Sequence, residues 1–107
     1  MVRGDVSSPP VLAGKALRAA IREAVRKFLD LDEYRVFLFG SEAAGVAGTH
    51  SDVDVGILGP RPVPGAVLQR IRDELDALRT LRGFDVVDFS RTDDSFRAEA
   101  LTHAEPL

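Results

Sequence analysis

The sequence contains no cysteine, which excludes disulfide bonds, thiolate chemistry and zinc sites built on cysteine. It also lacks long apolar runs: the longest, Val36 to Phe39, falls far short of the roughly 20 residues needed to cross a bilayer. The first residues show no basic segment followed by an apolar one, so no secretory signal is predicted. Together these absences favour a cytoplasmic protein that does not use a membrane.

Basic residues are also fewer than acidic ones. The 107 residues include 14 basic and 17 acidic side chains, which gives a net charge of −3. Domains whose main task is to bind a phosphate backbone are usually basic overall, so nucleic acid is disfavoured as a direct substrate. The length is typical of one domain, which buries about two-thirds of its unfolded surface without disulfides or a structural metal.

The sequence predicts a flexible lead over residues 1–10 and one folded domain over residues 11–107, because serines and prolines at positions 7–10 break any pattern. Apolar spacing indicates helices at about residues 11–29 and 67–83, and a last helix that begins at Asp93 or Asp94. Branched and aromatic runs indicate strands at residues 34–39, 51–58 and 84–89. We therefore expect an α+β layered fold, with a small three-stranded mixed sheet and helices covering one face.

A pair of aspartates opens the second predicted strand. Asp52 and Asp54 are two residues apart, so their side chains point to the same face, about 6.5–7 Å apart along the strand. Two ionised carboxylates this close repel each other, and a divalent cation would remove that repulsion. Oxygen ligands without cysteine suit Mg²⁺ or Mn²⁺, as one ion or as two roughly 3.5–4 Å apart. A lone Asp-x-Asp is usually a solvated strand start, so the interpretation depends on the motif beside it.

That motif is Gly40-Ser41, which ends the first predicted strand and is separated from Asp52 by ten residues. Glycine lets a phosphate approach the backbone closely, and Ser41 as an N-cap would start a helix whose free N–H groups favour an anion. The motif is not a Walker loop, because no Gly-Lys-Ser/Thr follows it. If the first two strands are neighbours, phosphate donors and metal-binding acids meet at one edge of the sheet, as in a site for magnesium and a nucleotide.

A third carboxylate is expected from the third strand, where Asp85 and Asp88 are both available. Because they are three residues apart in a strand, they face opposite sides, and only one of them can point at the site. Strand parity alone does not identify which of the two it is.

The chain resembles the DNA polymerase beta-like nucleotidyltransferase superfamily in three motifs that follow a helix: Gly40-Ser41, Asp52-Val53-Asp54 and the strand Phe84–Asp88. Its size and its last two segments, Arg97–Leu101 and Glu105–Leu107, look most like the minimal nucleotidyltransferases that are paired with HEPN-domain toxins. The resemblance runs from about residue 12 to the last residue.

The resemblance implies that Gly40 and Ser41 hold the triphosphate of ATP, and that Asp52 and Asp54 bind metal, with two Mg²⁺ ions expected. The family's third acid lies early in the third strand, which matches Asp85; it would complete the metal site or help deprotonate the acceptor. The resemblance also implies a reaction and a partner. AMP would pass from ATP to a protein hydroxyl, a tyrosine of the cognate HEPN ribonuclease toxin, so that the protein acts as an antitoxin.

Two other functions use the same residues. Such nucleotidyltransferases often carry an arginine after the serine, whereas this chain has Glu42, Ala43 and Ala44. That difference is compatible with a non-catalytic antitoxin that neutralises its toxin by binding alone. An intact Gly-Ser and three candidate acids favour catalysis instead. A nucleotide sensor that binds ATP without transferring any part of it is the third alternative.

Overall fold

A computed structural model of the chain describes residues 12–40, 52–80 and 82–107. In these ranges the elements follow one another in this order: α1 (Gly14–Arg26), β1 (Arg35–Phe39), β2 (Val53–Leu58), α3 (Gly65–Asp76), β3 (Phe84–Asp88), the 3-10 turn η2 (Phe89–Arg91), α4 (Asp94–Leu101) and β4 (Glu105–Pro106). The lead predicted over residues 1–10, Ser41 and the segment after it lie outside the described residues. None of the helices in these ranges has the length and apolar content that a membrane span requires.

The strands form one mixed sheet in the order β3-β2-β1-β4. β1 runs antiparallel to β2 and β4, whereas β2 and β3 are parallel. The mixed sheet is confirmed, but it has a fourth strand that the sequence does not predict. β4 has only two residues, and its place beside β1 depends on contacts between distant parts of the chain, among them the Leu107 amide, which donates to the Val36 carbonyl at 3.0 Å. Two residues are too few to show the alternation that marks a strand.

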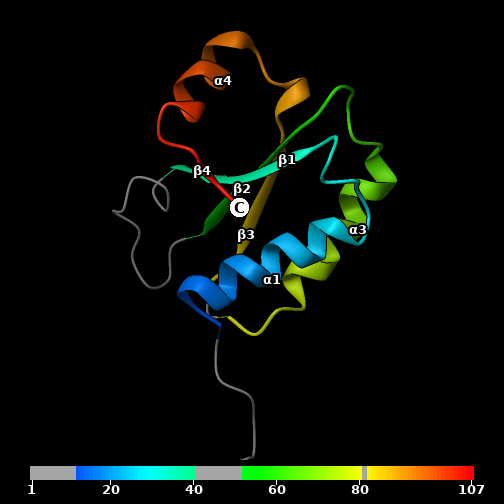
Figure 1. The fold of residues 1–107 in the computed structure, drawn as a ribbon, viewed down its shortest axis with the longest axis vertical. Helices are drawn as coiled ribbons and strands as arrows, with labels where there is room; N and C mark the ends of the chain where they lie inside the picture. Colours follow the sequence, from blue (N-terminus) through cyan, green and yellow to red (C-terminus); the bar gives the residue numbers. More distant parts are fainter. Residues whose placement is uncertain (1–11, 41–51, 81) are drawn as a thin grey trace, which may run out of the picture.

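One face of the sheet is covered by α1 and α3 (Figure 1). Because side chains alternate along a strand, Val53, Val55 and Ile57 of β2 all point to this face, and each is fully buried. They belong to the same aliphatic core as Ile21 of α1 and Ile71 of α3. The amphipathic patterns that predict these two helices therefore correspond to the faces that the helices bury.

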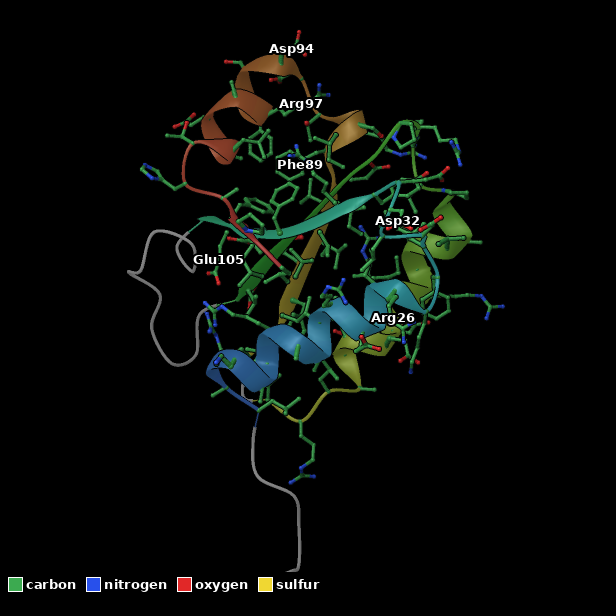
Figure 2. The ribbon with its side chains drawn as sticks, viewed as in Figure 1. Arg26, Asp32, Phe89, Asp94, Arg97 and Glu105 are labelled. Atoms are coloured by element: carbon green, nitrogen blue, oxygen red, sulfur yellow. The ribbon has the colours of Figure 1, made fainter. Side chains whose placement is uncertain are left out.

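The opposite face is covered by α4, which corrects the expectation that all the helices lie on one side (Figure 1). Phe37 and Phe39 of β1 form an aromatic cluster with Phe89, whose ring centroid lies 5.0 Å from each of theirs. Figure 2 shows Phe89 between the sheet and α4. Gly56 of β2 makes room for this cluster, because a Cβ atom at that position would overlap the rings of Phe37 and Phe89.

Both long helices are shorter than their apolar patterns predict. α1 covers Gly14–Arg26 rather than residues 11–29, and α3 ends at Asp76 rather than near Gly83. After α3 the amide of Leu78 donates to the carbonyl of Leu75 at 3.0 Å, which closes a turn. Leu78 still packs against the core from this turn, so the apolar pattern continues beyond the helix.

Arginine side chains contact both outer strands of the sheet. Arg72 of α3 donates through Nη2 to the Val86 carbonyl of β3 at 3.2 Å. At the other margin, Nε of Arg18 on α1 lies 2.6 Å from Oε2 of Glu105 on β4, which is an ion pair between a helix and the outer strand. Each outer strand is thus fixed to a helix by a side chain as well as by its neighbouring strand.

Candidate functional site

Two of the predicted acids, Asp54 and Asp85, lie side by side on neighbouring strands. β2 and β3 pair in parallel with Asp54 directly opposite Asp85, so their Cα atoms are about one strand spacing, roughly 4.8 Å, apart. Asp54 stands between Val53 and Val55, and Asp85 precedes Val86; all three valines are buried in the aliphatic core. By alternation, both aspartates point to the opposite face, the one that carries α4.

Asp54 is a partly buried acid among other acids. Burial raises the pKa of Asp54 above its ordinary value, and the carboxylates of Asp85 and Asp52 raise that pKa further. Desolvation and like charge therefore both disfavour the ionised form of Asp54. A bound cation would offset both effects, so the site suits a hard divalent ion such as Mg²⁺ in charge and in donor type.

Asp52 lies just outside the strands that position the other two acids. It is exposed, immediately before β2, and its Oδ1 atom would lie 3.0 Å from a Cβ added at Gly83, just before β3. Over residues 12–40, 52–80 and 82–107, no group of three or more histidine, aspartate or glutamate side chains is arranged to hold a metal ion. The structure pairs Asp54 with Asp85 but does not close all three carboxylates around one point, and the full ligand set remains a prediction.

Gly40 meets the acidic pair from the side of β1. It follows β1 directly and has a φ of 71°, in the left-handed region that residues with a Cβ atom rarely adopt. A Cβ at this position would overlap Oδ2 of Asp54 and lie 3.2 Å from its Cγ. The backbone of the predicted phosphate motif and the predicted metal ligand are thus in immediate proximity. Ser41, the other predicted phosphate contact, lies outside the described residues.

Asp88, the alternative third acid, has different surroundings from Asp85. It is 5% exposed, and strand parity directs it to the opposite face of the sheet from Asp85. Its carboxylate accepts hydrogen bonds from the Val63 amide at 2.8 Å, the Ser90 amide and hydroxyl at 3.0 and 2.7 Å, and Arg91 Nε at 3.1 Å. These bonds join the loop before α3 to the turn after β3, so Asp88 has a structural role and Asp85 is the one placed beside Asp54.

We expect Asp88→Asn to lower the free energy of unfolding by about 1–3 kcal/mol, because an amide cannot accept all of these hydrogen bonds. Burial alone would raise the pKa of Asp88, but the hydrogen bonds from Ser90, Val63 and Arg91 outweigh it and hold that pKa below its ordinary value. A lowered folded-state pKa contributes stability above the unfolded value, near 4, and that stability is lost as the pH falls through the folded-state pKa.

Urea unfolding from about pH 5 down to pH 2 measures this effect. The wild-type protein should lose more stability over that window than Asp88→Asn does. Asp76→Asn, at the exposed end of α3, is the matched control and should change neither the stability at neutral pH nor its acid dependence. Equal acid dependence in the wild type and Asp88→Asn would contradict the role assigned to Asp88.

A hollow of about 250 Å³ adjoins Gly40 on the α4 side of the sheet. Its lining consists of two residues at the end of β1 and four on or just after α4: Phe39, Gly40, Phe96, Glu99, Ala100 and His103. We call it the β1–α4 groove. No sequence pattern indicates it, because only the tertiary fold brings α4 over the end of β1.

Two neighbouring carboxylates can hold a divalent cation, and a glycine turn beside them lets a phosphate ester approach the backbone. The family model described as a nucleotidyltransferase domain matches residues 18–98. This match spans most of the chain, including Gly40, Asp52, Asp54 and Asp85, and the chain belongs to the nucleotidyltransferase domain family. No curated protein sequence matches the chain.

Several solved structures share the fold. A toxin–antitoxin structure with AMP-PNP has a TM-score of 0.63 at 20% identity, over 82% of this chain and 69% of the other. A tri-AMPylated HEPN toxin of Shewanella oneidensis in complex with its MNT antitoxin gives a TM-score of 0.58 at 17% identity, over 84% and 67%. The MntA–HepT toxin–antitoxin structure gives 0.58 at 16% identity, over 87% and 70%. At these identities the likeness is one of fold, and it confirms the fold expected from the sequence.

Proposed function

We propose that the chain is a minimal nucleotidyltransferase that transfers AMP from ATP to a tyrosine hydroxyl of a HEPN-type ribonuclease toxin, and so acts as an antitoxin in the cytoplasm. The observation that carries this proposal is the pairing of Asp54 with Asp85 beside Gly40, in a chain of the nucleotidyltransferase family. Structures of the same fold, one with AMP-PNP and one with an AMPylated HEPN toxin, support the choice of nucleotide and acceptor.

In this mechanism the chain mainly positions charged groups. Gly40 and Ser41 would hold the triphosphate through the backbone and a hydroxyl. Mg²⁺, held by Asp52, Asp54 and Asp85, would supply positive charge that offsets the charge of the phosphates and of the leaving pyrophosphate. Asp85, exposed in β3, would take the proton of the acceptor hydroxyl. The acceptor oxygen bonds to the α-phosphorus as the bond to pyrophosphate breaks, so AMP is transferred whole.

Antitoxin action by binding alone is the second candidate. It is favoured by Glu42, Ala43 and Ala44, where an arginine is often found in related nucleotidyltransferases. The two candidates differ in what they require, because modification needs magnesium and ATP whereas masking needs only the two proteins.

The first test is a labelling reaction with purified protein, Mg²⁺ and a lysate of the host cells. ATP is labelled at the α-phosphate in one reaction and at the γ-phosphate in the other. We expect one acceptor band labelled from the α-phosphate only, and mass spectrometry should find AMP on a tyrosine of that band. Label from the γ-phosphate in that band, present only when the purified protein is added, would indicate phosphoryl transfer and contradict the proposal. Toxin inhibition without nucleotide, together with no α-label, would support masking.

A further inference from the structure

We propose that the β1–α4 groove is the nucleobase subsite of the protein, and that Phe96 stacks on the base. This inference rests on the proposed function, because it assumes that a nucleoside triphosphate binds at Gly40 and Asp54. It adds a binding site and a residue that determines nucleotide affinity.

The position of the groove connects it with the phosphate motif. Gly40 is part of its lining and is also the residue whose Cα lies against the Asp54 carboxylate. Phe39, the preceding lining residue, is the direct register partner of Asp54 in the β1–β2 pairing. A nucleotide whose phosphates lie at Gly40 would therefore find the groove within the reach of its ribose.

Phe96 has the exposure of a stacking group. Among the described residues it is the one large apolar side chain left exposed, with 43% of its surface accessible. Its ring stacks on Phe89 at a centroid distance of 5.7 Å and an interplanar angle of 27°, and it meets Phe39 edge-on at 6.3 Å. The aromatic cluster holds the ring in place while leaving much of it uncovered, which suits a platform for a planar base.

The lining suits a base better than a phosphate. None of the described residues that line the groove is a lysine or an arginine, and its charged side chain, Glu99, would repel an anion. A neutral heterocycle avoids that repulsion, and a carboxylate at the rim can accept a hydrogen bond from an exocyclic amino group. A volume of about 250 Å³ also fits one ring system better than a peptide segment.

The order of the strands places this groove on the opposite side of Asp54 from Asp85, where the acceptor hydroxyl would approach. Asp85, Asp54 and Gly40 follow one another across β3, β2 and the end of β1. In-line transfer requires the acceptor and the leaving pyrophosphate on opposite sides of the α-phosphorus. With the pyrophosphate on the Gly40 side, the acceptor hydroxyl approaches from the side of Asp85. The groove therefore belongs to the nucleotide.

Calorimetric titration of two ligands tests the proposal. The first is an α,β-methylene analogue of ATP, and the second is inorganic tripolyphosphate, which has no base; both are used with Mg²⁺. Phe96→Leu keeps an apolar side chain but has no aromatic ring. It should weaken binding of the analogue at least about fivefold, the low end of a base–aromatic stack, and leave tripolyphosphate binding unchanged. Phe96→Trp should retain analogue binding, and Ser95→Ala, one residue earlier on α4, should change neither ligand.

The outcomes separate this inference from the proposed function. Equal binding of the analogue by the wild type and Phe96→Leu would overturn the base subsite, while the proposed function would stand because the triphosphate still binds. Unchanged nucleotide binding with weaker labelling of the acceptor protein would also overturn it, and would assign the groove to the acceptor. Failure of the wild type to bind either ligand would contradict the proposed function and this inference together.

Discussion

Replacing Asp54 with asparagine should abolish nucleotidyl transfer and, without divalent cations, make the protein more stable. Asp54 is the carboxylate between Asp85 and Gly40, so its loss removes a ligand of the Mg²⁺ that would offset the negative charge of the transition state. Losing several kcal/mol of charge stabilisation corresponds to a rate reduction of at least about a hundredfold to a thousandfold. Labelling of the acceptor from α-labelled ATP measures this effect.

The gain in stability follows from the sign of the pKa shift. The pKa of Asp54 is raised by burial and by the neighbouring acids, so ionisation of this group subtracts stability as the pH rises through its folded-state pKa. Asparagine removes that repulsion at neutral pH, and we expect Tm to rise by roughly 2–4 °C, or about half a kcal/mol for a domain of this size. Adding Mg²⁺ should raise Tm for the wild type and not for the variant.

Asp32→Asn is the matched control for the change in charge. Asp32 is an exposed residue that precedes the opposite end of β1 from Gly40, and its replacement should leave transfer and the magnesium response intact. Full transfer activity in Asp54→Asn would rule out the proposed mechanism. A lower Tm in the absence of Mg²⁺ would show instead that the carboxylate has a structural role.

The second large effect is expected from Gly40→Ala. The added Cβ would overlap Oδ2 of Asp54 and would impose a left-handed backbone on a residue that disfavours it, at a cost of about 1–2 kcal/mol. The carboxylate has to move away from its position beside Asp85. Because a displacement of about 1 Å at a reacting centre can cost a hundredfold in rate, we expect a loss of roughly that size in transfer.

Substitutions at two other glycines distinguish backbone strain from the collision with Asp54 as the cause of this loss. Gly14 has a φ of 55° and open space around its Cα, so Gly14→Ala reports backbone strain alone. Gly65, at the start of α3, has open space and no positive φ, and Gly65→Ala should be neutral or stabilising by up to about 1 kcal/mol. If Gly14→Ala reduces transfer as much as Gly40→Ala does, strain and not the collision with Asp54 is the cause.

The sequence predicts the parts of this fold that depend on local patterns. Three strands and the two long helices lie in the segments that apolar spacing indicates, although both helices are shorter than predicted, because burial of one face leaves a period of two or of 3.6 residues. The position of α4 and the existence of β4 depend on which surfaces meet in space. A helix of eight residues and a strand of two are too short for their apolar spacing to indicate which surfaces they contact.

Within the candidate site, too, some features follow from local sequence patterns and others only from tertiary contacts. Asp52 and Asp54 can be grouped from their spacing alone, whereas the choice between Asp85 and Asp88 requires the β2–β3 register, which aligns Asp85 with Asp54. The hydrogen bonds that occupy Asp88 come from a loop about 25 residues earlier and from the following turn, so no local motif indicates them. Phe96 looks like an ordinary apolar helix residue until α4 is placed over β1.

The way in which the backbone groups of the two outer strands are occupied affects how readily the protein aggregates at high concentration. An open sheet edge offers unpaired backbone groups to a strand of another molecule, which is a common route to aggregation. At one margin the Val86 carbonyl of β3 is already engaged by Arg72, and at the other β4 is two residues long and includes Pro106, which has no amide hydrogen to donate. The engaged carbonyl of β3 and the short, proline-containing β4 each disfavour strand addition by another molecule, which limits one route to aggregation of the domain.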